Sequence, residues 1–341
     1  MILDGQRPDA IERTALALAA GELAGMPTET VYGLAANAMD GAAVHRIYAA
    51  KGRPADHPLI VHVADAGRAQ DFAAGIPPLA RRLMQAFWPG PLTLILPRRA
   101  GVADAAAGGQ DSIGLRCPAH PVAQALLAAC AAHGVTGLAA PSANRFGRVS
   151  PTTAAHVAAE FGPGLLVLDG GPCAVGIESA IVDCTRGVPV LLRPGQLTRA
   201  AIEQAAGQRV HVPGDLPDAL ATPSPRAPGT LTAHYAPHAQ VRLMSTADLH
   251  AALGLLRDQA SGTVPAAPHI AVWARTPLPP VAGGIILRRM PDDAPAAAQQ
   301  LFAVLRGFDD AGAELIWIET PPATPAWEGV ADRLRRAAAS V

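Results

Sequence analysis

Residues 27–62 read PTETVYGLAANAMDGAAVHRIYAAKGRPADHPLIVH, and the rest of the chain is organised around them. The segment opens on the small hydroxyl and acidic groups of residues 28–30 and continues into a short predicted helix. It then reaches the basic sequence KGRP (51–54) and ends on an apolar run between His57 and His62. Polar and cationic loops set between apolar elements usually carry binding residues, so we expect the functional site here.

Lys51 is the only lysine in a chain that holds 27 lysine and arginine residues in total. Lysine is a compact point charge with rotatable donors, whereas arginine is a planar fork, so the two are not interchangeable at a binding site. Gly52 and Pro54 give the neighbouring backbone a special conformation. The pattern indicates a position that needs a point charge, and the alternative is a surface lysine retained by chance.

The composition is that of a globular protein with a sizeable core. At 341 residues, with 50% hydrophobic and 16% charged side chains, the chain is long enough for two domains. A net charge of −1 argues against a broad basic surface for duplex nucleic acid, although a local cationic cleft is compatible with it. The four cysteines are widely spaced, which is typical of buried thiols in a reducing compartment. With no secretory signal and no apolar run of about 18 residues, a cytoplasmic protein without a membrane segment is expected.

Residues 1–207 predict one α/β domain. Apolar residues recur at helical spacing in several segments, and short apolar runs typical of strands lie between them. Hairpin-like pairs of strands indicate a sheet that is partly antiparallel. We expect helices over residues 9–21, 41–50, 77–87 and 121–133, and strands over 23–26, 59–63, 92–96, 112–116, 137–140, 165–168, 180–183 and 190–192.

Residues 208–239 are predicted to form an extended linker that acts as a lid, because six prolines lie between positions 213 and 237. Within it, Tyr235 offers a flat face and a hydroxyl suited to closing over a nucleotide; the alternative is that it packs the linker against a domain. Residues 240–341 predict a smaller parallel-sheet domain. Its expected strands are 241–244, 270–274, 285–287 and 315–318, and its expected helices are 247–260, 294–311 and 327–339.

Cations and hydroxyls gather at the ends of the predicted strands. Such a set suits a polyanion such as a triphosphate, with arginine forks on the oxygens and hydroxyls filling the gaps. For each cation the alternative is an ordinary exposed side chain. The cations are Lys51, Arg53, Arg116, Arg145, Arg148 and Arg193, and the hydroxyl residues are Thr30, Ser112, Ser142, Ser150 and Ser179.

The sequence has no Walker A loop, no GxSxG nucleophile elbow and no HExxH zinc motif. His57 and His62 flank a predicted strand and are as readily structural as functional. Glu29 is either a catalytic carboxylate or a loop carboxylate that accepts hydrogen bonds from the backbone. The residues by themselves predict a cytosolic α/β protein with a cationic cleft for an anionic small molecule.

A series of motifs resembles the threonylcarbamoyl-AMP synthase family with its YrdC-like domain. The Lys-x-Arg and Ser-x-Asn pairs, here Lys51/Arg53 and Ser142/Asn144, are hallmarks of that family. The resemblance implies a twisted mixed sheet with a cationic cleft, followed by a smaller Rossmann-like α/β domain as in the longer, two-domain form. The motifs are PTETVYGL (27–34), KGRP (51–54), HPLIVHV (57–63), SIGLRCP (112–118), APSANRFGRVSPT (140–152), GIESAIVD (176–183), LLRPG (191–195) and PGTLTAHYAP (228–237).

The resemblance implies an enzyme that joins L-threonine, bicarbonate and ATP into threonylcarbamoyl-AMP and pyrophosphate. The product then serves the modification of the adenosine beside the anticodon in tRNAs that read ANN codons, so tRNA or tRNA-modification proteins are possible partners downstream. Mg²⁺ would arrive with ATP rather than in a protein metal site. The carboxylated amine of threonine would attack the α-phosphate, so the reaction needs positioned anions and neutralised charge rather than a protein nucleophile.

The same resemblance implies roles for individual residues. Lys51 and Arg53 would be catalytic, and Arg116 would fork onto the threonine carboxylate. His57 replaces an asparagine that is common in the family, and Ala180 replaces a threonine. By similarity, threonine would be held by Thr30, His62, Arg116, the Ala140 backbone and Ser179, and ATP by Lys51, Arg53, His57, Ser112, Ser142, Asn144, Ser150, Arg193 and Tyr235.

Two other functions are compatible with a YrdC-like domain. One is a module that binds double-stranded RNA or tRNA through a cationic concave face, but the near-neutral net charge counts against it. The other is the carbamoyltransferase of hydrogenase maturation, which carries zinc-binding cysteine pairs and further domains that this sequence lacks. Threonine-dependent release of pyrophosphate would separate all three.

Overall fold

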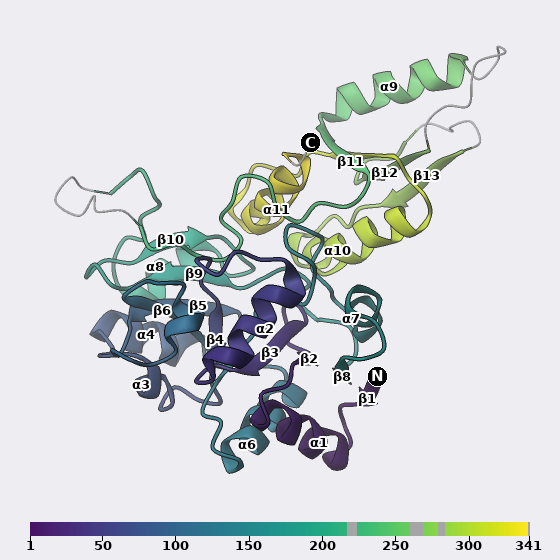
Figure 1. Ribbon diagram of the computed structural model, residues 1–341. Helices are drawn as coiled ribbons and strands as arrows, with labels where there is room; N and C mark the ends of the chain where they lie inside the picture. Colours follow the sequence, from purple (N-terminus) through teal and green to yellow (C-terminus); the bar gives the residue numbers. More distant parts are fainter. Residues whose placement is uncertain (217–223, 260–268, 279–283, 340–341) are drawn as a thin grey trace. The chain divides into compact units, whose positions relative to one another are not determined.

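The computed structural model describes residues 1–216, 224–259, 269–278 and 284–339 (Figure 1). Its contacts divide the chain into two compact units. Unit 1 comprises Met1–Phe146 and Ser150–Thr230, and unit 2 comprises Gly147–Val149 and Leu231–Val341. The predicted linker over 208–239 is therefore shared between the units, and its residues 217–223 lie outside the described part of the chain.

Unit 1 is built on a ten-stranded sheet in the order β1-β8-β2-β3-β7-β4-β6-β5-β9-β10. Parallel pairs such as β4 with β6 and antiparallel pairs such as β5 with β6 occur side by side, which confirms the predicted mixed α/β sheet. The strands are Ile2–Asp4 (β1), Ala24–Met26 (β2), Gly33–Asn37 (β3), Ile60–His62 (β4), Leu92–Pro97 (β5), Ser112–Arg116 (β6), Leu138–Ala139 (β7), Leu166–Asp169 (β8), Ala180–Asp183 (β9) and Val190–Arg193 (β10). The helices are Pro8–Ala19 (α1), Gly41–Lys51 (α2), Ala69–Phe72 (α3), Pro78–Phe87 (α4), Asp104–Ala107 (α5), Pro121–Ala132 (α6), Ala154–Phe161 (α7) and Arg199–Ala206 (α8).

The two faces of this sheet are covered differently. On one face, side chains such as Val61, Leu94 and Leu115 join a large apolar core with α2, α4 and α8. On the other face, α1 and α6 cover β2, β3, β7 and β8 through a second core that includes Leu18 and Leu126. Burial of these apolar stripes and faces is the main source of stability for such layers.

Towards β10, the second face is packed by a segment of the linker. Ile60, Ile95 and Ile181 form a small apolar cluster there with Ala227, which is buried. Side chains alternate along a strand, so residues two positions from these isoleucines, such as His62, lie on the same face. In unit 1, this face of the sheet thus carries polar side chains such as His62 beside the apolar cluster.

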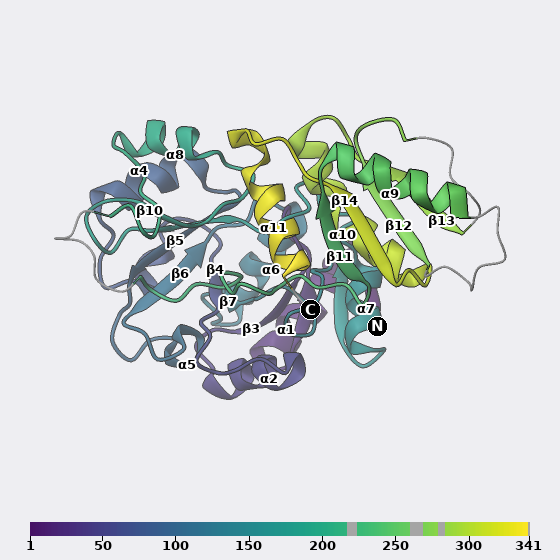
Figure 2. The same cartoon turned by 90° about the horizontal axis from the view of Figure 1, so that it is seen from above.

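Unit 2 contains a four-stranded sheet in the order β11-β14-β12-β13, and all of its pairs are parallel. Helix α9 lies on one face, and α10 and α11 lie on the other (Figures 1 and 2). This confirms the predicted smaller parallel-sheet domain. The elements are Gln240–Met244 (β11), Thr246–Gln259 (α9), Ile270–Ala274 (β12), Ile285–Arg289 (β13), Ala294–Asp310 (α10), Leu315–Glu319 (β14), the 3₁₀ turn Pro325–Trp327 and Glu328–Ala338 (α11).

Two predictions about the chain as a whole can be compared with the structure. All four cysteine side chains are buried, as expected for small apolar thiols. Among the described residues, no helix combines the length and the apolar character needed to cross a membrane.

Candidate active site

Lys51 is buried at the end of α2, with 3% of its surface exposed. Asp40 caps the start of this helix by accepting hydrogen bonds from two backbone N–H groups, and Gly52 ends it in the left-handed conformation (φ 63°). The Lys51 ammonium donates to the carbonyl of Ser142 at 2.6 Å and to that of Asn144. Burial, followed by the charge of Arg53, lowers the pKa of Lys51 well below its ordinary value. The Lys-x-Arg and Ser-x-Asn motifs are therefore brought together by direct hydrogen bonds.

Arg53 and His57 both contact the ring of Phe146, which was not predicted as a site residue. Arg53 donates to the carbonyl of Pro58 at 2.8 Å, and its guanidinium lies 5.8 Å from the centre of the Phe146 ring. The His57 ring contacts the same phenylalanine edge-on, with 5.5 Å between ring centres. Partial burial, and secondarily Arg53, lowers the pKa of His57. Cation–π and edge contacts of this kind hold both side chains at one place.

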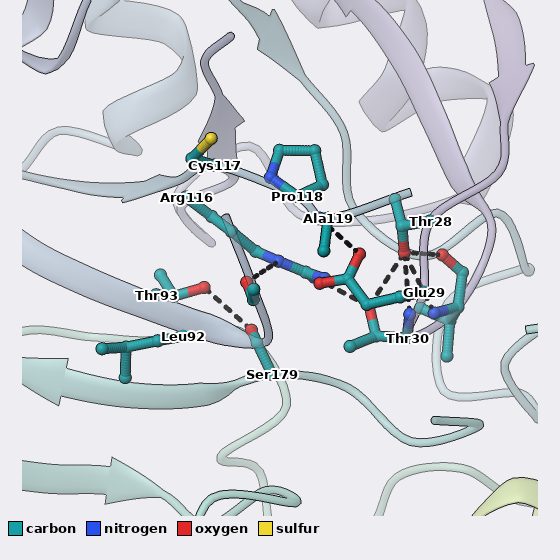
Figure 3. A network of polar contacts seen from close by, with 12 residues as sticks. Thr28, Glu29, Thr30, Leu92, Thr93, Arg116, Cys117, Pro118, Ala119 and Ser179 are labelled. Carbon is teal, nitrogen blue, oxygen red and sulfur yellow. Dashed lines mark hydrogen bonds and ion pairs between the residues drawn. The ribbon is translucent and has the colours of Figure 1, made fainter. Parts of the chain in front are cut away.

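Arg116 ends β6 and is also buried, with 4% exposure. Its Nη1 donates to the Thr30 hydroxyl at 2.7 Å, and its Nη2 donates to the Glu29 carboxylate at 2.6 Å (Figure 3). The other Glu29 oxygen accepts from the backbone N–H of Ala119 at 3.1 Å. Of the two interpretations of Glu29, the structure thus favours the loop carboxylate, with an arginine partner in addition.

His62 lies beside Arg116, because β4 and β6 are parallel and the two residues are paired in register. On its other side β4 pairs with β7, and the N–H of Ala140 donates to the carbonyl of Ile60 at 3.0 Å. The His62 side chain is buried, and its Nδ1 has no hydrogen-bond partner among the described residues. A buried polar atom without a partner is costly, so it marks a place where a ligand or water can bind.

The stability of the protein should depend on pH through His62. Burial, and then Arg116, lowers the pKa of His62 from the usual 6.5 to about 3. Between these values the unfolded chain binds a proton that the folded chain does not. The contribution of His62 to the free energy of unfolding is therefore fully present above pH 6.5. It falls as the pH decreases, by up to about 1.4 kcal/mol per pH unit. Urea unfolding at pH 7 and pH 5 should show a smaller difference for His62→Gln than for the wild type; equal differences would contradict this assignment.

Ser179 lies just before β9, and its side chain is hydrogen-bonded to two buried side chains, those of Thr93 and Arg193. Its hydroxyl lies 2.8 Å from the Thr93 hydroxyl and accepts a hydrogen bond from Arg193 Nη2 at 3.2 Å. Arg193 Nε also donates to the Ser179 carbonyl at 3.0 Å, and Nη1 donates to the carbonyl of Pro228 at 2.9 Å. One residue of the threonine set, Ser179, is thus bonded to one residue of the ATP set, Arg193. Thr93 was missed, although a single hydroxyl in the apolar run Leu92–Pro97 was a signal that could have found it.

The remaining hydroxyl candidates lie on separate segments of unit 1. Ser112 begins β6, four residues before Arg116. Ser142 forms an isolated backbone bridge with Gly33, which joins its loop to β3. Ser150 hydrogen-bonds the carboxylate of Glu178, and both residues are buried.

Tyr235 is placed in unit 2. It is 1% exposed, its ring lies 5.4 Å from that of Phe302, and Arg333 stands 5.5 Å from its centre. Its φ of 64° is unusual for a bulky residue and is kept only where the surroundings hold it. Within its own unit, Tyr235 therefore packs as a core residue.

Two of the six predicted cations, Arg145 and Arg148, hydrogen-bond residues that belong to neither proposed binding set. Arg145 stacks over the ring of Phe161 at 5.5 Å and donates to the carbonyl of Ala50. Arg148 belongs to unit 2 and donates to the carbonyl of Pro237 at 3.2 Å. Lys51, Arg53, Arg116 and Arg193 are all buried in unit 1, so the alternative of ordinary exposed side chains does not apply to them.

Both parts of the chain match known sequence families. The family described as "Telomere recombination" (Sua5_yciO_yrdC) matches residues 16–195, and the one described as "Threonylcarbamoyl-AMP synthase, C-terminal domain" matches residues 197–339. A protein from Bacillus subtilis named threonylcarbamoyl-AMP synthase is 36% identical over 96% of this chain and 92% of its own length. One of the same name from Pyrococcus abyssi is 46% identical over 65% of this chain and 64% of its own length.

Solved structures of P. abyssi Sua5 are similar to this chain. Its complex with L-threonine has a TM-score of 0.84 and 35% sequence identity, covering 97% of this chain and 95% of that one. Its H234A/Y235A variant has a TM-score of 0.85 and 34% identity, covering 99% and 96%. The matches in sequence and fold extend over both units. The chain therefore belongs to the threonylcarbamoyl-AMP synthase family, in its two-domain form.

Proposed function

We propose that this protein is an L-threonylcarbamoyladenylate synthase, a nucleotidyltransferase that uses L-threonine, bicarbonate and ATP. The observation that carries the proposal is the agreement over nearly the whole chain with relatives named threonylcarbamoyl-AMP synthase, including a structure solved with L-threonine. The product would serve tRNA modification, with tRNA or its modification proteins as partners downstream.

The geometry supports two adjoining subsites. For threonine, Arg116 and Thr30 are hydrogen-bonded, His62 is the register partner of Arg116, and Ala140 is bonded to the same strand as His62. Ser179 joins this set to the ATP set through Arg193. ATP would be held by Lys51, Arg53, His57, Ser112, Ser142, Asn144, Ser150 and Arg193, and by Tyr235 as part of the linker.

The chemistry needs no nucleophile from the protein. The threonine amine and bicarbonate form a carbamate with loss of water, and a carbamate oxygen then attacks the α-phosphorus of ATP. The bond from the α-phosphorus to the bridging oxygen breaks, and pyrophosphate leaves with the electron pair. Lys51 and Arg53 would offset the charge that develops on the phosphates, and the burial of both side chains makes their charges more effective than in water.

Magnesium would be carried by ATP. The buried cations of the proposed ATP set, Lys51, Arg53 and Arg193, suit phosphate oxygens rather than a metal ion. Among the described residues no three His, Cys, Asp or Glu side chains gather as a metal site. Bound to the phosphates, Mg²⁺ would add to the neutralisation of the leaving pyrophosphate.

The proposal predicts that pyrophosphate is released from ATP only when L-threonine and bicarbonate are both present. A coupled pyrophosphate assay with each substrate left out in turn measures this, and mass spectrometry identifies threonylcarbamoyl-AMP. Equal release without threonine would contradict the proposal. Binding of tRNA with no such activity would support the RNA-binding alternative instead.

A further inference from the structure

The carboxylate of Glu29 lies directly against the guanidinium of Arg116 (Figure 3). Both side chains are largely buried, with 11% and 4% of their surfaces exposed, and their closest atoms are 2.6 Å apart. The second oxygen of Glu29 is bound to the N–H of Ala119. A buried carboxylate held at both oxygens has a fixed orientation. Its hydrogen bond with Arg116 therefore also fixes the orientation of that guanidinium.

A count of donors shows what this contact leaves for a ligand. A guanidinium has five N–H bonds. In Arg116, Nε donates to the carbonyl of Gly90 at 3.3 Å, Nη1 to Thr30 at 2.7 Å and Nη2 to Glu29 at 2.6 Å. One N–H remains on each terminal nitrogen, and these two donors are available to the oxygens of a ligand carboxylate. The contact with Glu29 occupies one of the five donors and limits the directions from which Arg116 can bind a carboxylate.

The Thr28 hydroxyl lies beside that of Thr30, so it affects which hydrogen bonds Thr30 can form with a ligand. The Thr28 hydroxyl lies 2.6 Å from the carbonyl of Val31, which can only accept, so its single proton is used there. The Thr28 oxygen also accepts from the backbone N–H groups of Thr30 and Val31, each at 3.2 Å, and it lies 2.9 Å from the Thr30 hydroxyl. The Thr30 oxygen accepts from Arg116 and keeps a second lone pair. The site thus presents donors at Arg116 and an acceptor at Thr30, which suits the carboxylate and the amine of an α-amino acid.

We propose that Glu29 is a positioning residue of the threonine subsite, which orients Arg116 and offsets its charge so that the subsite prefers a zwitterion to an anion. The proposal rests on the proposed role of Arg116 in binding the threonine carboxylate. With Glu29 ionised, the pair of side chains has no net charge, and a zwitterionic ligand adds none. An anion would leave one uncompensated negative charge at this buried pair, which is costly.

The test compares Glu29→Gln and Glu29→Asp with the wild type. Gln keeps the size of the side chain but removes its charge, so we expect KM for threonine to rise about tenfold or more, with KM for ATP changed much less. The competing ligand is 2,3-dihydroxybutyrate, which carries a hydroxyl in place of the amine and is an anion. Its inhibition constant divided by KM for threonine should fall about tenfold in Glu29→Gln, because that variant adds one positive unit beside the ligand.

The Asp variant separates charge from position. It keeps the carboxylate but shortens the side chain, so threonine should bind more weakly while the preference for the zwitterion over the anion is unchanged. Threonine-induced shifts of the unfolding temperature give the same comparison without relying on turnover. An unchanged ratio for the two ligands in Glu29→Gln would overturn the proposal.

Two further variants complete the design. Asp183→Asn alters another buried carboxylate, bound to Arg186 at 2.7 Å, so it should lower stability and leave KM for threonine unchanged. Arg116→Ala tests the proposed site itself. If it leaves threonine affinity unchanged, the assignment of the threonine subsite fails; if it weakens threonine while Glu29→Gln does not, only the role of Glu29 fails.

Discussion

Lys51→Arg is expected to lose nearly as much activity as Lys51→Ala, about 2–4 kcal/mol in kcat/KM, or roughly 30- to 1,000-fold. Two of the three ammonium N–H bonds of Lys51 are used by the carbonyls of Ser142 and Asn144, which leaves one for a phosphate oxygen. A guanidinium is larger and planar, and at a site with 3% exposure it cannot take the same place without moving that loop.

The measurement is the steady-state rate of pyrophosphate release with ATP and threonine varied in turn. Lys51→Met retains most of the side-chain volume without the charge, and urea unfolding of all three variants separates loss of function from loss of stability. Arg46→Lys, an exposed change on the same helix, should leave the rate unchanged. Turnover at the wild-type level in Lys51→Arg would show that the position does not require a lysine.

Most long elements could be predicted because apolar periodicity and caps mark them. The helix over 41–50 was found from Asp40 and its apolar face, and the structure has it at Gly41–Lys51. The strand Gly33–Asn37 was missed, because its residues GLAAN are small and lack the β-branched side chains that mark strands. Its pairing with β2 and β7 is decided by neighbours far along the chain, which a local pattern does not contain.

The candidate site was predicted less completely than the fold. Motifs identified Lys51, which ends a helix, and Arg116 and Arg193, because such groups are unusual at the ends of apolar strands. The residues that orient them were not found in the same way, because a buried partner such as Thr93 is defined by a contact across the sheet. Phe146 is a similar case, since its importance lies in bringing Arg53 and His57 together.

The second large effect is expected from removal of the linker. In unit 1, Ala227 packs with Ile60 and Ile181 on the sheet face that also carries His62, and the carbonyl of Pro228 accepts from Arg193. Arg226, which precedes Ala227, donates its backbone N–H to the Gln110 side chain and accepts from it at its carbonyl. Its side chain forms an ion pair with Asp56 at 2.8 Å. This segment therefore lies against residues that are members of, or close neighbours to, the proposed ATP set.

The structure also indicates where a truncation should end. A chain ending at residue 207, the predicted domain boundary, would lose Val210, which is fully buried in the main core, and His211, which pairs with β10. We therefore compare the full chain with residues 1–216 and 1–230, and with full-length Tyr235→Ala. Both truncated forms keep the ten-stranded sheet and its two large cores and should fold, although 1–216 loses Ala227 from the small cluster.

We expect 1–216 to make at least about tenfold less threonylcarbamoyl-AMP than the full chain and to bind ATP more weakly, because it lacks Ala227 and Pro228, which contact the sheet face of His62 and Arg193. If the linker acts as the proposed lid, its removal also lets water reach the mixed anhydride. The 1–230 form restores Arg226, Ala227 and Pro228, so it should recover part of the ATP affinity. It lacks Tyr235, and if the lid needs that side chain, its product yield should resemble that of Tyr235→Ala. Product yield by mass spectrometry and ATP affinity by calorimetry distinguish these cases. A 1–216 protein that equals the full chain in both would show that residues 217–239 only connect the two units, and the proposed activity would then belong to unit 1 without a lid.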